Sequence, residues 1–387
     1  MKGNDPFVKI RPYNDVELPY AINRMLQSHG FISSLMNFLP DEPLNLLVRS
    51  IRKTKTCFEF QANIFGKICQ TFIDRSIDDL TVAGFDNLDK KKAYLYLANH
   101  RDIVMDSAIM QLYRLTYGLK PCRSGIGDNL LASQILTDVA KVCNMFTITR
   151  TGDARHMVAA SKLVSEYIRH SICMEKESIW IAQRNGRTKD GYDKTQQSVL
   201  KMFCINDRKQ DIYDSIRELN IVPLTISYEF EPCDQMKARE LILTDNGNKK
   251  YTKAPNEDFN SIRTGVFAYK SRVHLHFGEP INDLIDESLV FSNDNEKIQY
   301  ICSLIDKQMH KNYRLWPNNH IAYDMLNNNT DFQNYYSEFS KRDFIKHILK
   351  QANVEDVSYA KMKQMLYTIY ANPVRAAVGK GDVGLNF

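Results

Sequence analysis

The pattern of apolar and polar positions changes twice along the chain. Residues 18 to 73 carry apolar side chains at roughly helical spacing, which predicts helices. From about residue 80 the pattern becomes short apolar runs, rich in β-branched and aromatic residues and short enough for strands. Residues 284 to 387 return to helical spacing, and the tail from residue 379 is expected to be loose. Helices are therefore expected at both ends of a strand-rich middle.

Six apolar runs predict strands. Between the third and the fourth lies segment 154–170, whose apolar residues share one helical face, with Thr151 or Asp153 placed to cap its start. Residues 229–271 form a polar excursion with a short helix near 235–243. A strand, a helix and another strand in this order indicate a mainly parallel sheet. The predicted strands are residues 80–84, 93–98, 144–149, 178–183, 221–228 and 272–277.

These elements predict an α/β fold in three regions. A mainly parallel central sheet flanked by helices is expected over residues 78–283. An N-terminal helical region precedes it at 1–77, and a helical C-terminal extension follows at 284–387. The N-terminal helical pattern is expected to break at Gly30 and to end at Pro40.

Composition narrows the class of protein. With 43% hydrophobic and 25% charged residues, the chain is typical of a soluble globular protein that can bury a substantial site. Its net charge of +5 suits anionic small molecules or an anionic membrane surface. No basic repeat or nucleic-acid motif is present, so we expect no nucleic-acid partner.

The cysteines and the N-terminal segment indicate a cytoplasmic protein. The eight cysteines are scattered, with no close pair typical of a zinc or redox site, and are expected to be reduced and mostly buried. The first 15 residues lack a signal-peptide core, and no apolar run is long enough to span a bilayer. If the protein acts on lipid, it must therefore lie on the membrane surface.

A basic cluster in the N-terminal region has two interpretations. Cations there could face anionic headgroups as part of an amphipathic, membrane-interfacial surface. A helical pair packed on the main domain, with solvated cations, is at least equally consistent with the sequence. The cluster consists of Arg49, Arg52, Lys53 and Lys55.

The sequence LANHRDIVMDS follows the second predicted strand and places carboxylates behind a histidine. A neutral histidine can accept a proton from a hydroxyl that attacks a carbonyl, while a carboxylate on its other ring nitrogen fixes the tautomer. Asp102 lies two residues beyond His100, and Asp106 lies six beyond. Taken alone, the segment is more typical of a helix start that Asp102 caps.

Arg150 directly follows the third predicted strand and precedes a helix. A phosphate at this position could be held by the guanidinium group and by free helix N–H groups. A surface ion pair is the ordinary alternative. Because ligands bind beyond the carboxyl ends of parallel strands, the loop at Arg150 and the loop at 183–191 can face the same crevice.

The loop QRNGRTKDG follows the fourth predicted strand and is the second cationic segment. A glycine among several cations gives a flexible, positively charged turn suited to an anionic ester. A solvated loop is the alternative. Its cations are Arg184, Arg187 and Lys189, and they surround Gly186.

Two further features involve predicted strands. Pro223 lies near the start of the fifth strand, which favours an edge or first position for it. His274 and His276 share one face of the sixth strand and could bind a metal, but no third ligand is evident. Ordinary strand histidines are the favoured interpretation, and no metal is expected.

In this order, the segments resemble the motifs of the glycerolipid acyltransferase family, which includes glycerol-3-phosphate and 1-acylglycerol-3-phosphate acyltransferases. The resemblance covers about residues 78–280. Asn99, His100 and Asp106 partly match the family's Asn-His-x4-Asp. The other similar segments are FTITR (146–150) for the second motif, NGRT (185–188) for the third, VPL (222–224) for the fourth and TVAGFDNL (81–88) for the entry strand.

The resemblance implies transfer of a fatty acyl group from an acyl-CoA or acyl-carrier-protein thioester to the free hydroxyl of 1-acylglycerol 3-phosphate, which forms phosphatidate in bacterial phospholipid synthesis. It implies that His100 is the general base and that a carboxylate orients it. It implies no further cofactor and a location on the inner face of the cell membrane. The residues implied to hold the acceptor phosphate are Arg150, Arg184, Asn185, Gly186, Arg187 and Lys189.

Two departures from the family pattern affect these roles. Five residues separate His100 and Asp106 instead of four, so either the turn absorbs one residue or Asp102 is the orienting carboxylate. We favour Asp106 as the orienting carboxylate, because Asp102 is well placed to cap the helix that carries Asp106. Asn185 stands where the family has glutamate, and it can accept a hydrogen bond but brings no charge.

Other functions fit parts of the sequence. Within the same class, the acceptor could be glycerol 3-phosphate or the hydroxyl of an aminolipid. From a different class, the altered His–Asp spacing fits a non-catalytic lipid-binding protein on the same fold. A metal-dependent hydrolase is less favoured, because no set of metal ligands is evident.

Overall fold

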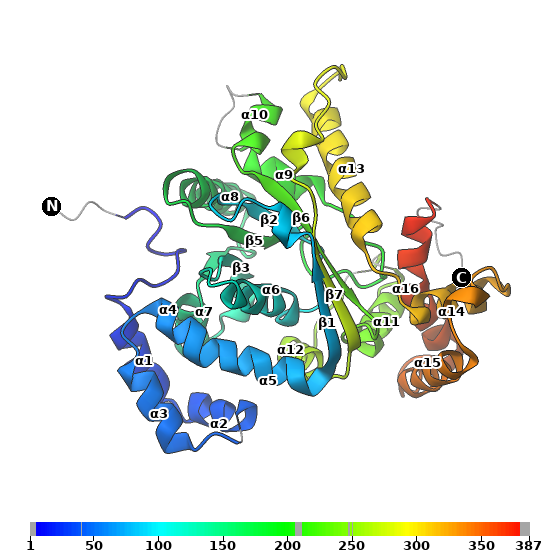
Figure 1. Ribbon diagram of the computed structural model, residues 1–387, viewed down its shortest axis with the longest axis horizontal. Helices are drawn as coiled ribbons and strands as arrows, with labels where there is room; N and C mark the ends of the chain where they lie inside the picture. Colours follow the sequence, from blue (N-terminus) through cyan, green and yellow to red (C-terminus); the bar gives the residue numbers. More distant parts are fainter. Residues whose placement is uncertain (1–4, 40, 206–210, 247, 250, 380–387) are drawn as a thin grey trace.

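The computed structural model describes residues 5–39, 41–205, 211–246, 248–249 and 251–379. Within these residues, seven strands form one sheet with helices on both faces (Figure 1). The strand order is β1-β7-β6-β2-β5-β3-β4. The strands are β1 (Ile77–Ala83), β2 (Leu95–Ala98), β3 (Arg123–Gly127), β4 (Met145–Ile148), β5 (Ile179–Ala182), β6 (Ile221–Tyr228) and β7 (Ser271–Phe277).

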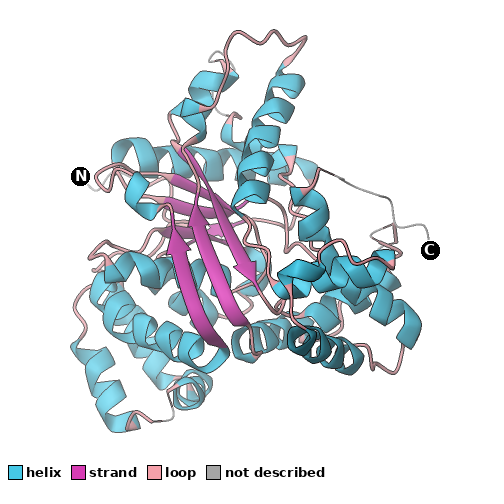
Figure 2. Cartoon of the chain, turned by 45° about the vertical axis from the view of Figure 1, so that its right-hand side comes forward, coloured by secondary structure: helices cyan, strands magenta, loops and turns pink. Residues whose placement is uncertain are grey.

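The sheet is mainly parallel, which confirms the predicted fold class. Strand β2 pairs in parallel with β5 and β6, and β3 pairs in parallel with β4 and β5. Strand β7 is antiparallel to β6, and β1 runs parallel to β7 (Figure 2). The carboxyl ends of β2, β3, β4, β5 and β6 therefore lie along one edge of the sheet.

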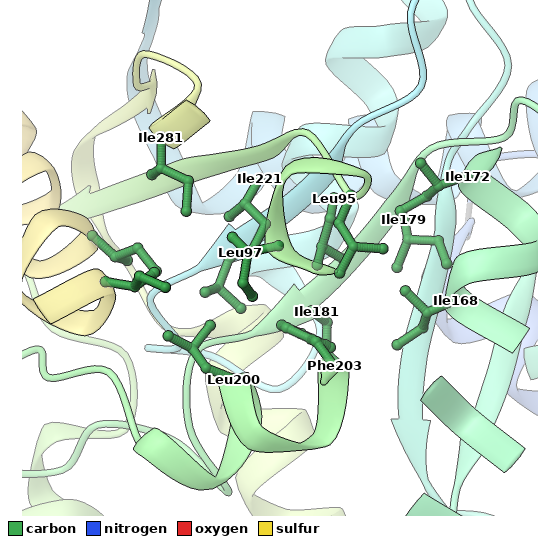
Figure 3. Close-up of a cluster of buried hydrophobic side chains, with 14 of the residues drawn as sticks. Leu95, Leu97, Ile168, Ile172, Ile179, Ile181, Leu200, Phe203, Ile221 and Ile281 are labelled. Atoms are coloured by element: carbon green, nitrogen blue, oxygen red, sulfur yellow. The ribbon is translucent and has the colours of Figure 1, made fainter. Parts of the chain in front are cut away.

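Alternation along the strands gives the sheet two apolar faces. On β2, Leu95 and Leu97 pack into one buried cluster (Figure 3), whereas Tyr96 and Ala98 belong to the cluster on the opposite face. Because successive side chains point to opposite sides of a sheet, His100 continues on the face of Ala98. That face also carries Trp180 of β5.

Strand β3 was not predicted from the sequence RSGIG. Its two glycines lower strand propensity, but neighbouring side chains lie where a Cβ would be. A Cβ on Gly125 would lie 2.6 Å from the Ile148 side chain, and one on Gly127 would lie 2.8 Å from Arg150 Nε. The close approach of these side chains to the strand therefore favours glycine.

The expectation that Pro223 marks an edge or first position was wrong, because β6 lies between β2 and β7. The Pro223 carbonyl accepts a hydrogen bond from Gly278 N at 2.8 Å, so the proline nitrogen also points to the β7 side. On that side the paired register begins only at Leu224, opposite Phe277. The missing N–H thus falls just outside the β6–β7 ladder.

Helices precede the sheet, as predicted. The chain breaks at Ser28, whose side chain accepts from Phe31 N, and not at Gly30, which lies inside α2. The predicted stop at Pro40 falls outside the described residues. The N-terminal helices are α1 (Leu18–Gln27), α2 (His29–Phe38), α3 (Leu44–Lys53), α4 (Cys57–Phe60), the π-helix η1 (Gln61–Phe65) and α5 (Gly66–Ser76).

Helices also connect the strands. The Asp153 side chain accepts from His156 N at 2.8 Å, which confirms one of the two predicted caps of α8. The predicted helix near 235–243 is α11. The connecting helices are α6 (Met105–Thr116), α7 (Gln134–Val142), α8 (Ala154–Arg169), α9 (Gln197–Phe203), α10 (Ile212–Arg217), α11 (Asp234–Leu243) and α12 (Glu257–Phe267), with the 3-10 turns η2 (Phe85–Asn87) and η3 (Asp128–Leu130) and the π-helix η4 (His170–Met174).

The C-terminal extension is helical, as predicted, while the division into regions at residues 77 and 283 stays a prediction. All eight cysteines are free and six are buried, as expected. No helix in the described residues is long and apolar enough to cross a bilayer. Residues 380–387 of the predicted loose tail lie outside the description. After the short turn η5 (Ile281–Asp283), the extension consists of α13 (Asp294–Asn312), α14 (Pro317–Asn327), η6 (Gln333–Tyr335), α15 (Glu338–Gln351) and α16 (Tyr359–Ala377).

Candidate active site

The turn after β2 brings His100 against the first turn of α6. His100 Nδ1 lies 2.9 Å from Asp106 Oδ2. The edge of the Trp180 ring packs against the imidazole, with ring centroids 5.9 Å apart. The His100 side chain is 12% exposed and that of Asp106 is 1% exposed. His100 Nε2 forms no hydrogen bond with any described residue, so this nitrogen is available to a substrate.

Asp106 is surrounded by donors that fix its role. Its Oδ2 atom accepts hydrogen bonds from Arg101 N at 2.7 Å and Asp102 N at 2.9 Å, and its Oδ1 accepts from the Tyr228 hydroxyl at 2.8 Å. Burial, together with the nearby Asp106, raises the pKa of Tyr228 well above its ordinary value, so this hydroxyl stays a donor. Because Oδ2 already accepts from backbone N–H groups, His100 Nδ1 carries the hydrogen and Nε2 keeps its lone pair.

Asp102 has a different function in the same turn. Its Oδ1 atom accepts from Val104 N at 2.9 Å and Met105 N at 2.8 Å, so it caps the start of α6. The extra residue between histidine and aspartate is absorbed in this capped turn. Asp106, the partner we favoured, therefore contacts His100, and its catalytic role stays a prediction.

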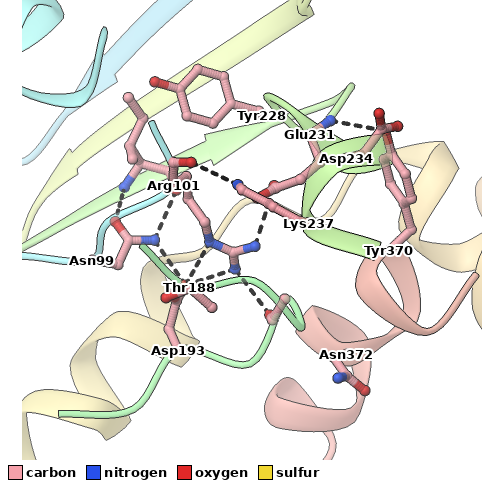
Figure 4. Close-up of polar contacts among 12 residues, drawn as sticks. Asn99, Arg101, Thr188, Asp193, Tyr228, Glu231, Asp234, Lys237, Tyr370 and Asn372 are labelled. Carbon is pink, nitrogen blue, oxygen red and sulfur yellow. Dashed lines mark hydrogen bonds and ion pairs between the residues drawn. The ribbon is translucent and has the colours of Figure 1, made fainter. Parts of the chain in front are cut away.

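A buried network of charges holds the residue after His100 (Figure 4). Arg101 is 1% exposed; its Nη2 lies 2.7 Å from Asp193 Oδ2, and its Nη1 lies 3.2 Å from Glu231 Oε2. Lys237 Nζ donates to Glu231 Oε1 and to the Arg101 carbonyl, both at 2.6 Å. Two positive and two negative groups therefore balance one another away from water.

The residue before His100 is held by the same network. Asn99 Nδ2 donates to Asp193 Oδ2 at 2.8 Å, and Asn99 Oδ1 accepts from Ile226 N at 2.8 Å. The His100 carbonyl itself accepts from Thr188 N at 2.6 Å. The backbone of His100 is thus fixed on both sides, as catalytic preorganisation requires.

Four members of this arrangement were not predicted from the sequence. Asp193, Glu231 and Lys237 lie about 90 to 140 residues from the histidine motif, and a charged residue in a polar segment gives no sign of burial. Tyr228 did carry a signal, because alternation along the predicted strand places it on the same face as Leu224 and Ile226.

The loop after β5 lies beside His100, because β5 is the neighbour of β2 and Thr188 bonds the His100 carbonyl. Arg184 Nε and Arg187 Nη1 are buried without a hydrogen-bond partner in the described part of the chain. Gly186 has φ of 78° with open space around it, a backbone conformation that favours glycine. Asn185 is exposed, and its backbone N–H donates to Gln196 Oε1 at 2.7 Å.

Two of the cations predicted to bind phosphate, Lys189 and Arg150, have a less direct connection with His100. Lys189 forms an ion pair with Glu240 of α11. Arg150 follows β4, which lies three strands away from β2 in the sheet. At ~4.8 Å per strand, the carboxyl ends of β4 and β2 are ~14 Å apart. Its backbone N–H donates to Asp128 Oδ1 at 3.1 Å, and burial lowers the pKa of its guanidinium group. The structure therefore brings Arg184 and Arg187 closer to the strand that carries His100 than Arg150.

Residues 79–203 match the protein-family model described as Acyltransferase. This part of the chain is similar to the acyltransferase family. It runs from β1 to the end of α9 and contains His100, Asp106, Arg150 and the loop after β5. Two members of the charge network, Glu231 and Lys237, lie outside the matched residues.

One solved structure with similarity to this chain is the 1-acyl-sn-glycerophosphate (LPA) acyltransferase PlsC from Thermotoga maritima. The two chains are 15% identical, the alignment covers 77% of this chain and 95% of that one, and the TM-score is 0.36. Comparison with curated proteins gave no match.

Proposed function

We propose that this acyltransferase moves a fatty acyl group from an acyl-CoA or acyl-carrier-protein thioester to the free hydroxyl of 1-acylglycerol 3-phosphate and forms phosphatidate. The observation that carries the proposal is the His100–Asp106 hydrogen bond at the carboxyl end of β2, inside the acyltransferase match. A buried carboxylate behind an accessible imidazole is the arrangement that general-base catalysis requires. No further cofactor takes part in the proposed reaction.

In the proposed reaction, His100 Nε2 takes the proton of the acceptor hydroxyl as its oxygen attacks the thioester carbonyl. Asp106 stabilises the imidazolium ion that forms. The tetrahedral intermediate then collapses, the C–S bond breaks, and the leaving thiolate receives the proton from His100. An ester and a free thiol result, and the base returns to its starting state.

The acceptor phosphate is assigned to the cationic loop after β5. The unpartnered nitrogens of Arg184 and Arg187 support this, because buried N–H donors without a protein acceptor can bind an anionic ligand. Gly186 lets the backbone approach the ligand, and Asn185 adds a neutral polar group. Arg150, which follows β4, and Lys189, which is paired with Glu240, are the remaining cations proposed to act on the phosphate.

The N-terminal helices are assigned to the cytoplasmic surface of an anionic membrane. Four exposed cations of α3 and the following turn form no ion pair with any residue in the described ranges. Leu46 and Phe58 flank them in sequence and are 52% and 41% exposed. Cations beside exposed apolar side chains fit a peripheral membrane surface. The cations are Arg49, Arg52, Lys53 and Lys55.

A His100→Ala variant tests the proposed reaction. With lysophosphatidate and an acyl thioester in mixed micelles, loss of the base should lower the rate of phosphatidate formation by about 10²- to 10⁴-fold. His170→Ala, at an exposed histidine of η4 outside the N-terminal helices, is the matched control and should keep the wild-type rate. Full activity of His100→Ala with an unchanged melting temperature would refute the assignment of the base.

An acceptor panel tests the substrate. Lysophosphatidate, glycerol 3-phosphate and a hydroxylated aminolipid without phosphate would each be assayed with one thioester donor. We expect lysophosphatidate to give the highest kcat/KM. Preference for the phosphate-free aminolipid would contradict the role given to Arg184 and Arg187, and activity on none of them would favour a lipid-binding protein.

A further inference from the structure

Two histidines occupy the sheet face opposite the candidate active site. His274 and His276 alternate on β7 with Val273 and Leu275, which belong to the apolar cluster on the Trp180 side. The two imidazoles therefore point away from His100. Figure 2 looks toward β1 and β7 at this end of the sheet, with no helix in front of them. Both histidines are half-buried.

Polar groups from neighbouring elements converge on this pair. Thr81 of β1 lies opposite His274 in the register, and its hydroxyl is 2.8 Å from His274 Nδ1. Arg314 Nη1 donates to the same hydroxyl at 3.3 Å. The two imidazole centroids are 5.8 Å apart. A hydroxyl, an arginine and two imidazoles thus form one continuous group across β1, β7 and the segment after α13.

Arg314 is held in place by an aromatic ring. Its guanidinium lies 4.7 Å from the centroid of Trp316, and Arg272 lies over the same ring at 5.0 Å. Arg272 is neutralised by Glu229 at 2.6 Å, but Arg314 forms no ion pair with any described residue. The charge of Arg314 is therefore oriented and unneutralised.

The surroundings of the histidines are positive. Burial, with His276 and Arg314, lowers the pKa of His274 to about 4, and burial with Lys311 lowers the pKa of His276. Lys311 is exposed and forms no ion pair in the described part of the chain. No group of three or more potential metal ligands occurs among the described residues. Positive neighbours disfavour a metal cation at this pair and favour an anion.

We propose that His274, His276, Thr81, Arg314 and Lys311 form a phosphate-binding site on the sheet face opposite His100. A guanidinium fork, an ammonium, a hydroxyl and imidazole N–H groups are the donors that phosphate oxygens accept. The ligand is a phosphate monoester or diester, carried by a lipid headgroup or by a soluble molecule. The site uses none of the proposed catalytic residues, so a result that refutes the acyl-transfer reaction would not refute the phosphate site.

Histidine NMR of the full-length protein tests the site directly. The ring signals of His274 and His276, assigned with His274→Gln and His276→Gln, would be followed during titration with inorganic phosphate. Separate titrations would use phosphatidylcholine vesicles with and without phosphatidylglycerol. A shift of both signals with inorganic phosphate identifies a soluble-phosphate site, and a shift only with phosphatidylglycerol vesicles identifies a headgroup site. Either result supports the proposal.

Charge-matched variants control for non-specific attraction. The double variant Lys311→Gln/Arg314→Gln should weaken binding by about tenfold or more, because charge-assisted hydrogen bonds are lost. Arg342→Gln/Lys346→Gln removes the same charge from exposed positions on α15 and should leave binding unchanged. Equal weakening by the two double variants, or no shift of His274 and His276 with any probe, would overturn the proposal.

Discussion

The buried charge network around Arg101 can be tested by removing Asp193. The Asp193 carboxylate accepts from Arg101, Asn99 and Thr188, and its side chain is 3% exposed. In Asp193→Ala the guanidinium would keep Glu231 at 3.2 Å and the Gly191 carbonyl at 3.0 Å, but it would lose its shortest partner. An uncompensated charge would then remain in a site without water.

The expected magnitude follows from this burial. Removing one partner of a buried ion pair destabilises a protein by about 3–5 kcal/mol, whereas an exposed pair contributes about 0–1 kcal/mol. The Lys67–Glu42 pair, with side chains 56% and 40% exposed, provides the matched comparison. We expect Asp193→Ala to lower the free energy of unfolding by about 3–5 kcal/mol and Glu42→Ala by less than about 1 kcal/mol.

Urea unfolding followed by circular dichroism measures both variants under one condition. The urea midpoints of each variant and of the wild type, analysed with one shared m-value, give the loss of unfolding free energy caused by each substitution. If Asp193→Ala loses no more stability than Glu42→Ala, the buried network does not hold the turn that carries His100. In that case the preorganisation of His100 would need another explanation.

Three further outcomes follow from the geometry. Tyr228→Phe removes one donor to Asp106 and should lower kcat about tenfold with KM unchanged in steady-state assays; a change in KM alone would contradict this. Gly191→Ala places a Cβ 1.9 Å from the Ile369 carbonyl and should lower the melting temperature, while Gly118→Ala, at similar positive φ with open space, should have a smaller effect. Burial opposes ionisation of Asp193, but the Arg101 guanidinium outweighs burial and lowers the pKa of Asp193. The stabilisation that ionised Asp193 gives the folded protein is therefore present above pH ~3.9 and is lost on further acidification. Acid unfolding should therefore be steeper in the wild type than in Asp193→Asn.

The sequence predicted those parts of the fold that depend on local pattern. Short apolar runs rich in β-branched and aromatic residues identified six strands, and Asp153 was among the two predicted caps of α8. Strand β3 escaped prediction because its glycines serve contacts with Ile148 and Arg150, which only the folded sheet brings near. Pro223 was placed wrongly because strand order, and not the strand's own sequence, decides which side of β6 is unpaired.

The candidate site was predictable only where its residues are close in sequence. The pair His100 and Asp106 could be proposed because one turn and the start of one helix carry both. Asp193 and Lys237 reach the same turn from distant segments, and their burial depends on long-range packing. Polar residues of this kind have no periodic signal, so they emerge only from the three-dimensional structure.

We propose that His100 and Asp106 act as one catalytic unit. The most direct test is a double-mutant cycle in kcat for phosphatidate formation, with His100→Ala, Asp106→Ala and the double variant. If Asp106 acts through His100, the double variant should be no slower than His100→Ala alone. Independent effects whose fold-losses multiply in the double variant would contradict the account.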